Sequence, residues 1–283
     1  MLRAAAGLAG GRTTGYAGVK ISVITVCRNS ARTIADTLRS VAAQTHVEVE
    51  HIIVDGASTD ATLDIIRAQG QLLTRVISEP DHGIYDAMNK GIALASGDVI
   101  GFLNSDDYFA GPNELEFVVK AFEDPGVDAC HADLVYVDEH DSNKVVRYWK
   151  SSDYQLGQFK TGWMPAHPTF YVRRSVYQTL GGFDLQFRLQ ADFELTTRFL
   201  EVHRIKSVHI PRVMVTMRTG GATNRSLTNV LKGNLEAYRA CLKNGLPVTP
   251  LFMLRKVLSR IPQFLARHPD AVDPARRKVT RNV

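Results

Sequence analysis

The sequence predicts an α/β fold: a Rossmann-like, open, twisted and mostly parallel sheet with helices on both faces, followed by C-terminal helices. Short runs rich in Val and Ile alternate with segments whose apolar residues recur at helical spacing, which is the rhythm of βαβ units. Polar residues follow several of these runs, as they do at the carboxyl ends of parallel strands. With 283 residues, of which 45% are hydrophobic and 22% charged, the chain can bury a substantial core.

The first half of the chain carries the clearest strand and helix patterns. The run at residues 20–27 is β-branched, and Ser30 is placed to cap a helix in which Ile34, Leu38 and Val41 recur at helical spacing. The same alternation predicts the later elements of this half: strands at 49–54, 75–78 and 99–103, a helix carrying Leu63, Ile65 and Ile66, and a helix at 84–94.

The second half alternates less regularly and has hairpin-like strands. Its predicted elements are a helix at 113–122, strands at 129–137, 144–149 and 205–217, a loop leading into a helix across 184–202, and helices at 227–242 and 251–267. Pro211 favours an edge position or an interruption of the last strand, because proline cannot donate to the ladder. Pro262 is expected to kink the last helix.

Three regions follow from this pattern. Residues 1–19 are rich in Gly and Ala and are expected to form a disordered tail. Residues 20–220 are expected to form one domain with two halves, 20–108 and 109–220. Residues 221–283 are expected to be helical and basic.

The cysteines exclude two classes of small, cross-linked protein. Cys27, Cys130 and Cys241 lie far apart without CxxC spacing, so the sequence predicts neither a disulfide framework nor a zinc cluster. This pattern favours a reducing, cytoplasmic location. No run approaches the roughly 18 apolar residues of a membrane span.

The net charge of +5 is concentrated at one end of the chain. The segment from Leu251 onward holds eight of the 34 Lys and Arg residues but two of the 29 Asp and Glu residues. A nucleic-acid-binding protein would spread positive charge over its folded surface, so no nucleic-acid partner is expected. A basic amphipathic helix at 251–267 instead favours peripheral binding to the anionic inner face of the cell membrane. A helix packed on the body is the alternative.

The most informative stretch is residues 99–108, VIGFLNSDDY. An apolar strand stops at Asn104, Ser105, Asp106 and Asp107, and open α/β sheets bind ligands at this edge. The alternative is an ordinary turn, which favours the same residue types.

Residues 27–30, which follow the first strand, contain no glycine. The GxGxxG phosphate cradle is therefore absent, which disfavours a Rossmann dehydrogenase. Without it, the charge of a nucleoside diphosphate would be met by Mg²⁺ or Mn²⁺ held by carboxylates, with Asp106 as the natural ligand. Arg28 and Lys90 are candidates for helping to neutralise phosphate.

Four blocks of sequence resemble the inverting family 2 glycosyltransferases, whose fold is the glycosyltransferase A-type. The blocks are SVITVCRNS with TIADTLRSVAAQ, HIIVDGASTDAT, EPDHGIYDAMNKGIALASGDVIGFLNSDD and LQADFELTTRFL, and together they cover roughly residues 20–218. The sequence is most similar to the bacterial branch that builds exopolysaccharides, O-antigens (lipopolysaccharide) and surface glycolipids. The resemblance makes 20–108 the nucleotide-sugar-binding half and 109–220 the acceptor half.

The resemblance also implies donor-binding positions: Thr25, Arg28, Asp55, Asp81, Asn89, Lys90, Asn104 and Ser105. Thr25, Arg28 and Asp55 would surround the base and ribose, whereas Asp81, Asn89 and Lys90 would lie along the diphosphate and donor sugar. Asn104-Ser105-Asp106 stands where the family carries its Asp-x-Asp motif, with Asp106 as the metal ligand. Asn104 departs from the usual first Asp, which removes one negative charge.

Asp192 matches the general base of the family. In an inverting displacement the acceptor hydroxyl loses its proton as it attacks the anomeric carbon, and a carboxylate within hydrogen-bond reach can take that proton. An acidic residue near the start of a helix also has a purely structural explanation in the helix dipole. Trp163 and His167 lie in a loop suited to stacking on and contacting an acceptor sugar, although a proline-rigidified turn would account for that loop equally well.

The expected function is therefore inverting, metal-dependent transfer of a sugar from a nucleoside diphosphate to a hydroxyl of a lipid-linked or glycolipid acceptor in bacterial surface polysaccharide biosynthesis. A nucleotidyltransferase would need a Gly- and Arg/Lys-rich triphosphate loop, which Arg28-Asn29-Ser30 does not supply. A non-catalytic nucleotide-sugar-binding assembly or regulatory subunit is the alternative from another class, and Asn104 is the residue that favours it.

Overall fold

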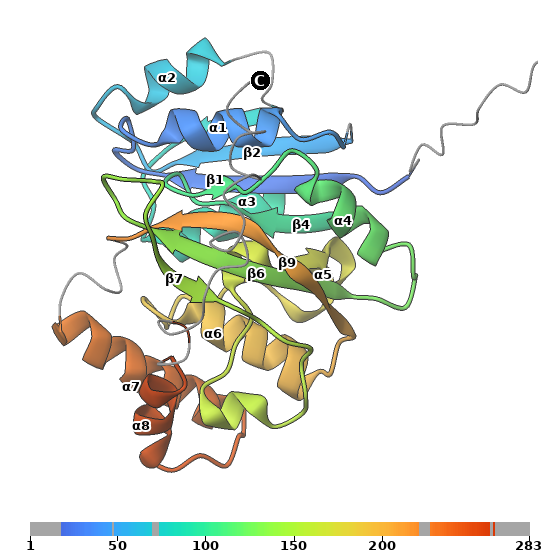
Figure 1. Cartoon of the computed structure of the whole chain (residues 1–283), viewed down its shortest axis with the longest axis vertical. Coiled ribbons are helices and arrows are strands. Elements are labelled where there is room, and N and C mark those ends of the chain that lie inside the picture. Colours follow the sequence, from blue (N-terminus) through green and yellow to red (C-terminus); the bar gives the residue numbers. More distant parts are fainter. Residues whose placement is uncertain (1–17, 47, 70–73, 221–226, 261–262, 264–283) are drawn as a thin grey trace, which may run out of the picture.

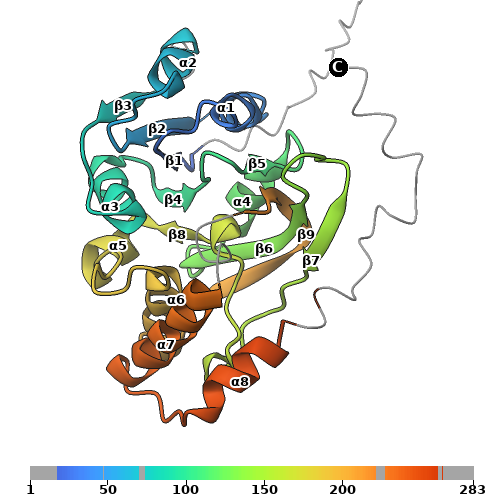
Figure 2. The same cartoon turned by 90° about the vertical axis from the view of Figure 1, so that its left-hand side faces the viewer.

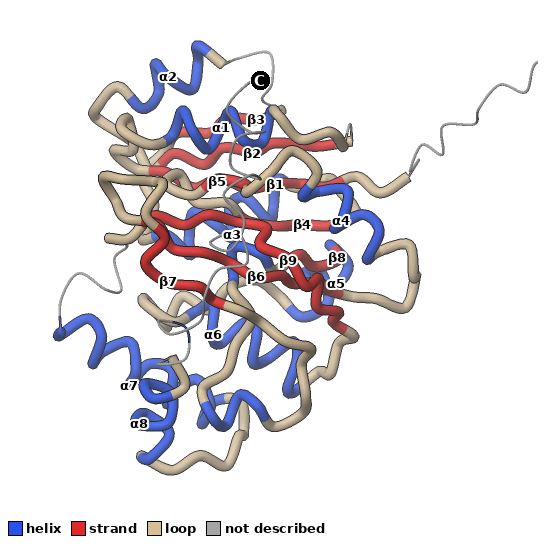
Figure 3. Tube along the Cα trace, viewed as in Figure 1, coloured by secondary structure: helices blue, strands red, loops and turns tan. Residues whose placement is uncertain are grey.

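A nine-stranded sheet runs through the protein in the order β3-β2-β1-β4-β8-β6-β9-β5, with β7 paired to β6 (Figures 1 and 3). This computed structural model describes residues 18–46, 48–69, 74–220, 227–260 and 263. The strands are β1 (Ile21–Cys27), β2 (Val49–Asp55), β3 (Arg75–Ser78), β4 (Val99–Phe102), β5 (Tyr108–Phe109), β6 (Ala129–Val137), β7 (Val145–Trp149), β8 (Tyr171–Arg173) and β9 (Ser207–Arg218).

Helices cover the sheet and extend below it (Figure 1). The α-helices are α1 (Ile34–Ala42), α2 (Thr62–Ala68), α3 (Ile84–Leu94), α4 (Glu114–Ala121), α5 (Arg174–Leu180), α6 (Ala191–Thr196), α7 (Leu227–Lys243) and α8 (Leu251–Leu258). Two short 3₁₀ turns, η1 (Gln158–Thr161) and η2 (His167–Thr169), precede β8, and the π-helix η3 (Thr197–Val202) continues α6. The α/β class and the C-terminal helices are as predicted.

The parallel part of the sheet is β3-β2-β1-β4. Strand β1 is buried along its whole length because both faces are covered. Ile24 and Val26 pack with α3 residues in one core cluster, whereas Cys27 packs with α1 residues in another. Figure 2 shows α1 and α3 on opposite sides of β1 and β2. The carboxyl ends of these strands therefore meet at one edge.

The rest of the sheet is mixed, in agreement with the irregular pattern of the second half. Strand β8 is antiparallel to β4 and β6, β9 is parallel to β6, and β7 pairs with β6 as a hairpin. The register between β6 and β9 jumps from Ala132↔Ile210 to Asp133↔Val213. Pro211 lies inside this jump, which confirms the predicted interruption.

Some details differ from the sequence prediction. Ser30 does not cap α1, because the helix begins at Ile34 and the Ser30 hydroxyl pairs with Ser105 Oγ at 2.8 Å instead. Strands β5 and β8 and helix α5 were not predicted. The last helix ends at Leu258 within the described residues. Most of the predicted N-terminal tail and the kink at Pro262 lie outside the part of the chain that the structure describes.

Candidate active site

The turn after β4 presents one carboxylate and buries the next. Asp107 N donates to Asn104 O at 3.0 Å, and Asn104 Nδ2 donates to Asp107 Oδ2 at 3.1 Å. Thr37 Oγ1 on α1 donates to Asp107 O at 2.7 Å, which fixes the turn against α1. Asp107 is fully buried, whereas Asp106 is partly exposed. Asp106 is therefore the carboxylate of this pair that a ligand can reach.

Two oxygens of this turn are buried without a hydrogen-bond partner: Asn104 Oδ1 and Asp107 Oδ1. Burial raises the pKa of Asp107 well above its usual range, and the charge of Asp106 adds to the rise. Carboxylate and amide oxygens are the ligands that Mg²⁺ and Mn²⁺ prefer, so the donor set fits a hard cation. Among the described residues, no group of three or more His, Cys, Asp or Glu could hold a metal ion. A cation at Asp106 would thus take further ligands from a bound diphosphate.

Asp192 lies in the first turn of α6, and three donors hold its carboxylate. Tyr85 OH on α3 donates to Oδ1 at 3.0 Å, and Phe193 N donates to the same oxygen at 2.9 Å. His167 Nδ1, at the start of η2, lies 3.2 Å from Oδ2. The side chain is 13% exposed. The carboxylate is therefore oriented by two other elements and still accessible at one side.

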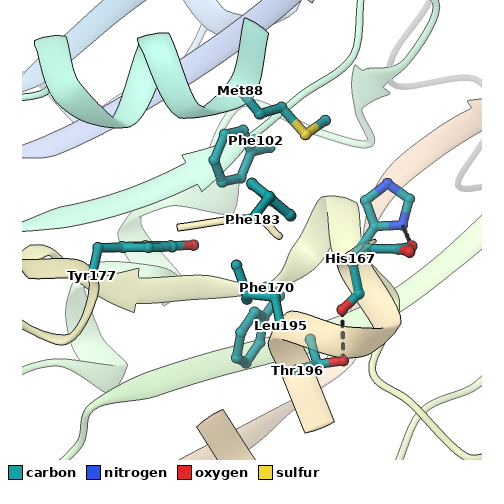
Figure 4. A pocket seen from close by; sticks show the side chains of 9 residues that line it. Met88, Phe102, His167, Phe170, Tyr177, Phe183, Leu195 and Thr196 are labelled. Atoms are coloured by element: carbon teal, nitrogen blue, oxygen red, sulfur yellow. Dashed lines mark hydrogen bonds and ion pairs between the residues drawn. The ribbon is translucent and has the colours of Figure 1, made fainter. Parts of the chain in front are cut away.

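A small cavity adjoins this carboxylate (Figure 4). Its lining residues come from α3, β4, η2, α5 and α6 and the loop before α6: Met88, Phe102, His167, Phe170, Tyr177, Phe183, Asp192, Leu195 and Thr196. Most of these side chains are apolar, and Asp192 is the one carboxylate among them. Such a lining excludes water from one side of Asp192 and strengthens the electrostatic interactions of its charge.

His167 links the acidic turn to Asp192. Burial lowers the pKa of His167, and the negative charges of Asp192 and Asp106 oppose this effect without cancelling it. The imidazole is therefore neutral at neutral pH and can act as a hydrogen-bond donor. Because both carboxylates act on one imidazole, the fold brings Asp106 and Asp192 to a single site, although they lie far apart in the sequence.

The loops after β1 and β2 lie at the same carboxyl edge of the parallel strands as the acidic turn after β4. Asn29 and Ala57 adopt positive φ angles of 51° and 55°. Asn29 N donates to Ser58 Oγ at 2.8 Å, which ties the two loops together. Left-handed conformations of non-glycine residues cost roughly 1–3 kcal/mol and cluster at functional sites. Arg28 is exposed in the first of these two loops.

Comparison with known proteins identifies the family. Residues 22–181 match the sequence profile of Glycosyl transferase family 2. The chain belongs to this family. It is 33% identical over 180 residues to the PGL/p-HBAD biosynthesis glycosyltransferase of Mycobacterium bovis (strain BCG / Pasteur 1173P2), covering 62% of this chain and 68% of that protein.

Solved structures share the fold of this family 2 glycosyltransferase. Staphylococcus aureus TarS 1–349 in complex with UDP aligns with a TM-score of 0.61 and 18% identity, over 88% of this chain and 71% of that one. The mannosyltransferase PcManGT from Pyrobaculum calidifontis, in complex with GDP-Man and Mn²⁺, aligns with a TM-score of 0.59 and 18% identity, over 93% and 80%. Such neighbours place the chain in the glycosyltransferase A-type fold.

Asp55 and Asp81 lie at the predicted edge. Asp55 is fully buried at the end of β2, and its carboxylate accepts hydrogen bonds from Ser58 and from Ser78 Oγ at 2.7 Å. Burial alone would raise the pKa of Asp55, but the hydrogen bonds from Ser58 and Ser78 outweigh it and lower the pKa. Asp81 packs over Gly56, where a Cβ atom would collide with its carboxylate.

Two predicted donor residues have structural partners instead. Thr25 is fully buried, and its Oγ1 lies 3.0 Å from His51 Nε2, so it supports the sheet beneath the edge. Asn89 uses both ends of its amide on the backbone of Phe183, at 2.8 and 2.9 Å. In this conformation burial keeps Thr25 away from a bound sugar nucleotide, and the Asn89 amide is engaged by the loop at Phe183. Asn89 instead fixes the loop that carries Phe183 into the cavity.

Lys90 and Trp163 lie beside the site. Lys90 Nζ contacts Glu79 Oε1 and Pro80 O, each at 2.8 Å, and the hydrogen bond that it donates to Glu79 raises the pKa of Lys90. Trp163 packs against His131, Tyr154 and Phe159 with ring centroids 5.5–5.9 Å away, and it remains partly exposed. An acceptor sugar would therefore meet one edge of an aromatic cluster here.

Two site residues of this glycosyltransferase were missed by sequence reasoning. Tyr85 lies inside the block EPDHGIYDAMNKGIALASGDVIGFLNSDD, but its spacing marks no chemistry. Arg218, at the end of β9, donates to Asp106 O at 2.8 Å and to Asp36 Oδ2 at 2.5 Å. No local pattern predicts that the last strand brings an arginine to the acidic turn, because β9 reaches this edge through long-range pairing.

Proposed function

We propose that this glycosyltransferase moves a sugar from a nucleoside diphosphate donor to an acceptor hydroxyl with inversion at the anomeric carbon, and that Asp192 is the general base. The observation that carries the proposal is the Asp192 carboxylate, held by Tyr85 and His167 beside an apolar cavity. A preorganised carboxylate of this kind can take a proton without reorienting.

The proposed step is a single displacement. Asp192 takes the proton of the acceptor hydroxyl, the hydroxyl oxygen bonds to the anomeric carbon, and the bond from that carbon to the diphosphate oxygen breaks. Burial and the Asp192 charge raise the pKa of Tyr85 well above its usual value, so Tyr85 stays protonated and keeps donating to Asp192. Tyr85 and His167 therefore orient the base without competing for the substrate proton.

Asp106 is the proposed ligand of a divalent cation, Mn²⁺ or Mg²⁺. When bound there, such a cation would offset the negative charge that grows on the departing diphosphate. Arg28, Asp55, Asp81, Lys90, Asn104 and Ser105 remain the proposed donor side of the site, and Trp163 and His167 the proposed acceptor side. The UDP complex of TarS and the GDP-Man and Mn²⁺ complex of PcManGT support a nucleotide-sugar donor and a cation.

The proposed acceptor is lipid-linked or a glycolipid of the bacterial cell surface. The name of the M. bovis relative, a PGL/p-HBAD biosynthesis glycosyltransferase, is consistent with this. No helix within the described ranges is long and apolar enough to cross a membrane. We propose peripheral contact with the inner face of the cell membrane, on the ground of the exposed apolar and basic side chains of the C-terminal helices.

The C-terminal helices carry the surface for that contact. Helix α8 buries Phe252 but exposes Leu251, Leu254 and Leu258, which are 50–54% exposed. Helix α7 exposes Leu231 at 68%. Exposed leucines beside Arg255 suit an interface that buries apolar side chains among anionic headgroups.

Donor and cation binding test the donor half of the proposal. Thermal shift of the full chain is measured with UDP-, GDP- and dTDP-sugars, each with and without Mn²⁺ or Mg²⁺, because a ligand that binds the folded state raises the melting temperature. We expect one sugar nucleotide to stabilise the wild type and Asp192→Asn alike, in a cation-dependent way, and to lose the cation dependence in Asp106→Asn. Stabilisation without turnover in the wild type would favour the non-catalytic subunit.

A further inference from the structure

Helix α8 has an unusual distribution of side chains. Its leucines Leu254 and Leu258 are about half exposed, whereas Lys256 is 1% exposed. A lysine is almost never fully buried unless it is paired, because its charge is costly to remove from water. Packing of the helix alone would put a leucine at this position. The buried ammonium therefore needs a partner that explains it.

That partner is Gln190, two residues before the proposed base Asp192 in the chain. Lys256 Nζ donates to Gln190 Oε1 at 2.5 Å and lies 4.6 Å from the centre of the Phe193 ring. Gln190 immediately precedes α6, and Phe193 lies in the first turn of α6, next to Asp192. Lys256 thus contacts residues on both sides of Asp192 in the chain.

A second contact from the C-terminal helices holds the same segment. Glu236 on α7 accepts hydrogen bonds from Leu189 N at 2.7 Å and from Gln190 N at 3.1 Å. These backbone groups lie just before the helix start, so Glu236 fixes the direction in which the chain enters α6. Helix α7 therefore binds the backbone of the segment before Asp192, and helix α8 binds the side chain of Gln190 in the same segment.

Helix α8 also packs against the loop that leads to His167. At Gly162, which has a φ of +87°, a Cβ atom would collide with the backbone and side chain of Lys256. Gly162 lies at the end of η1, five residues before His167 in the chain. The close approach of α8 thus braces the two segments that carry Asp192 and its partner His167.

We propose that Lys256 and Glu236 are positioning residues that hold Asp192 and His167 in their reactive arrangement, which makes α7 and α8 part of the active site. The inference rests on the proposed role of Asp192. It extends the site from Asp192 on α6 to the two C-terminal helices, which like Asp192 lie outside residues 22–181, the part that matches the family profile. Neither residue reaches the cavity lining, so they act through Gln190 and the start of α6.

Steady-state kinetics with the full chain test this role. We expect Lys256→Met and Glu236→Met, which remove the hydrogen bonds to Gln190 and Leu189, each to lower kcat about 10- to 100-fold, because a small misplacement of a catalytic group has an effect of this size. The KM for the donor should stay close to that of the wild type, since the acidic turn is untouched. Lys232→Met, on the exposed face of α7, is the matched control and should leave kcat unchanged.

A pH series of thermal unfolding tests the burial of Lys256 independently of activity. Burial lowers the pKa of Lys256 to about 7 and the charge of Arg260 lowers it further, against the opposing effects of Asp192, Cys241 and Glu236. The unfolded chain binds this proton up to about pH 10.4, so Lys256 should contribute stability that increases between about pH 7 and pH 10. The buried thiols of Cys27, Cys130 and Cys241, whose pKa values burial raises, act in the opposite direction above about pH 8.5, but equally in both proteins. The difference in stability between the wild type and Lys256→Met should therefore grow in favour of the wild type across this range.

The outcomes separate the two proposals. If Asp192→Asn is inactive but Lys256→Met and Glu236→Met keep the wild-type kcat, the positioning role is wrong and the proposed function stands. If Asp192→Asn is as active as the wild type, the proposed function fails and the positioning role fails with it. A pH profile of the stability of Lys256→Met identical to that of the wild type would also overturn the inference, and Glu236→Met covers the case in which Lys256→Met does not fold.

Discussion

The hydroxyl of Tyr85 donates a 3.0 Å hydrogen bond to Asp192 Oδ1. Its ring stacks on Phe183, with centroids 5.3 Å apart, and the backbone of Phe183 is in turn held by Asn89. Helix α3 thereby orients a carboxylate that belongs to α6. The relationship crosses the two halves of the domain, which makes it a direct test of how the site is assembled.

Tyr85→Phe should lower kcat by roughly tenfold, since a hydrogen bond to a charged group contributes about 1.5–3 kcal/mol and its loss leaves Asp192 less well oriented. The ring packing is kept, so the fold should persist. The matched control is Tyr148→Phe, because Tyr148 OH on β7 donates a comparable bond to Asp133 Oδ2 on β6 at 2.6 Å. Equal effects of both variants on kcat would contradict the orienting role of Tyr85.

His167 should make the protein less stable at mildly acidic pH. Burial lowers the pKa of His167 in the folded state, whereas the unfolded chain takes up the proton at about pH 6.5. Stability is therefore present above this value and is lost as the pH falls below it. In His167→Asn, thermal unfolding between pH 5 and pH 7 should depend less on pH than in the wild type, and identical curves would exclude this contribution. His51 and His131, whose pKa values burial also lowers, act equally in both proteins and cancel in the comparison.

Asn104→Asp restores the residue that the family usually has at this position and should show how Asn104 affects stability and cation binding. The wild-type amide donates to Asp107 Oδ2 at 3.1 Å, and the variant would place a second carboxylate there without that donor. We expect the free protein to lose about 1–3 kcal/mol of stability, the usual effect of an unpaired buried polar group. With Mn²⁺ and donor present, its melting temperature should rise more than that of the wild type. A cation response equal to that of the wild type would argue against a metal at this turn.

The apolar face of α7 and α8 should bind anionic vesicles. Replacing Leu254 and Leu258 by Glu puts two charges on the exposed face, and cosedimentation with vesicles containing anionic lipid should fall by at least tenfold, because burial of each leucine contributes roughly 1.5–3 kcal/mol. Replacing the exposed Val76 by Glu is the control, since it lies on the edge strand β3, across the molecule from α7 and α8 (Figures 2 and 3). Unchanged sedimentation of the double variant would refute membrane contact through this face.

Periodicity and strand-end chemistry predicted the frame of the molecule. Helix α3 has the predicted bounds because its apolar residues repeat at helical spacing, and strand β3 has them because Pro80 breaks the chain soon after Val76 and Ile77. Strands β5 and β8 escaped prediction because two or three residues carry no period and form only by pairing with distant strands. The interruption at Pro211 was predictable because it depends on the lack of one backbone donor.

The site was predictable only in part. Acidic residues after β4 and in the last family block pointed to Asp106 and Asp192 from sequence alone. The partners of Asp192 were not evident, because Tyr85 and His167 are brought to it by tertiary packing. Lys256 was misleading: its charge placed it on the expected polar face of a surface helix, yet the fold buries it against Gln190.

The central claim is that Asp192 is the base of the transfer. The most direct measurement is release of nucleoside diphosphate from the stabilising donor, with acceptor present, by the wild type, Asp192→Asn and the exposed-surface control Asp64→Asn. We expect Asp192→Asn to bind the donor as the wild type does but to turn over about 10²- to 10⁴-fold more slowly, the range for loss of a general base. Asp64→Asn should match the wild type. Turnover by Asp192→Asn at the wild-type rate would contradict the account.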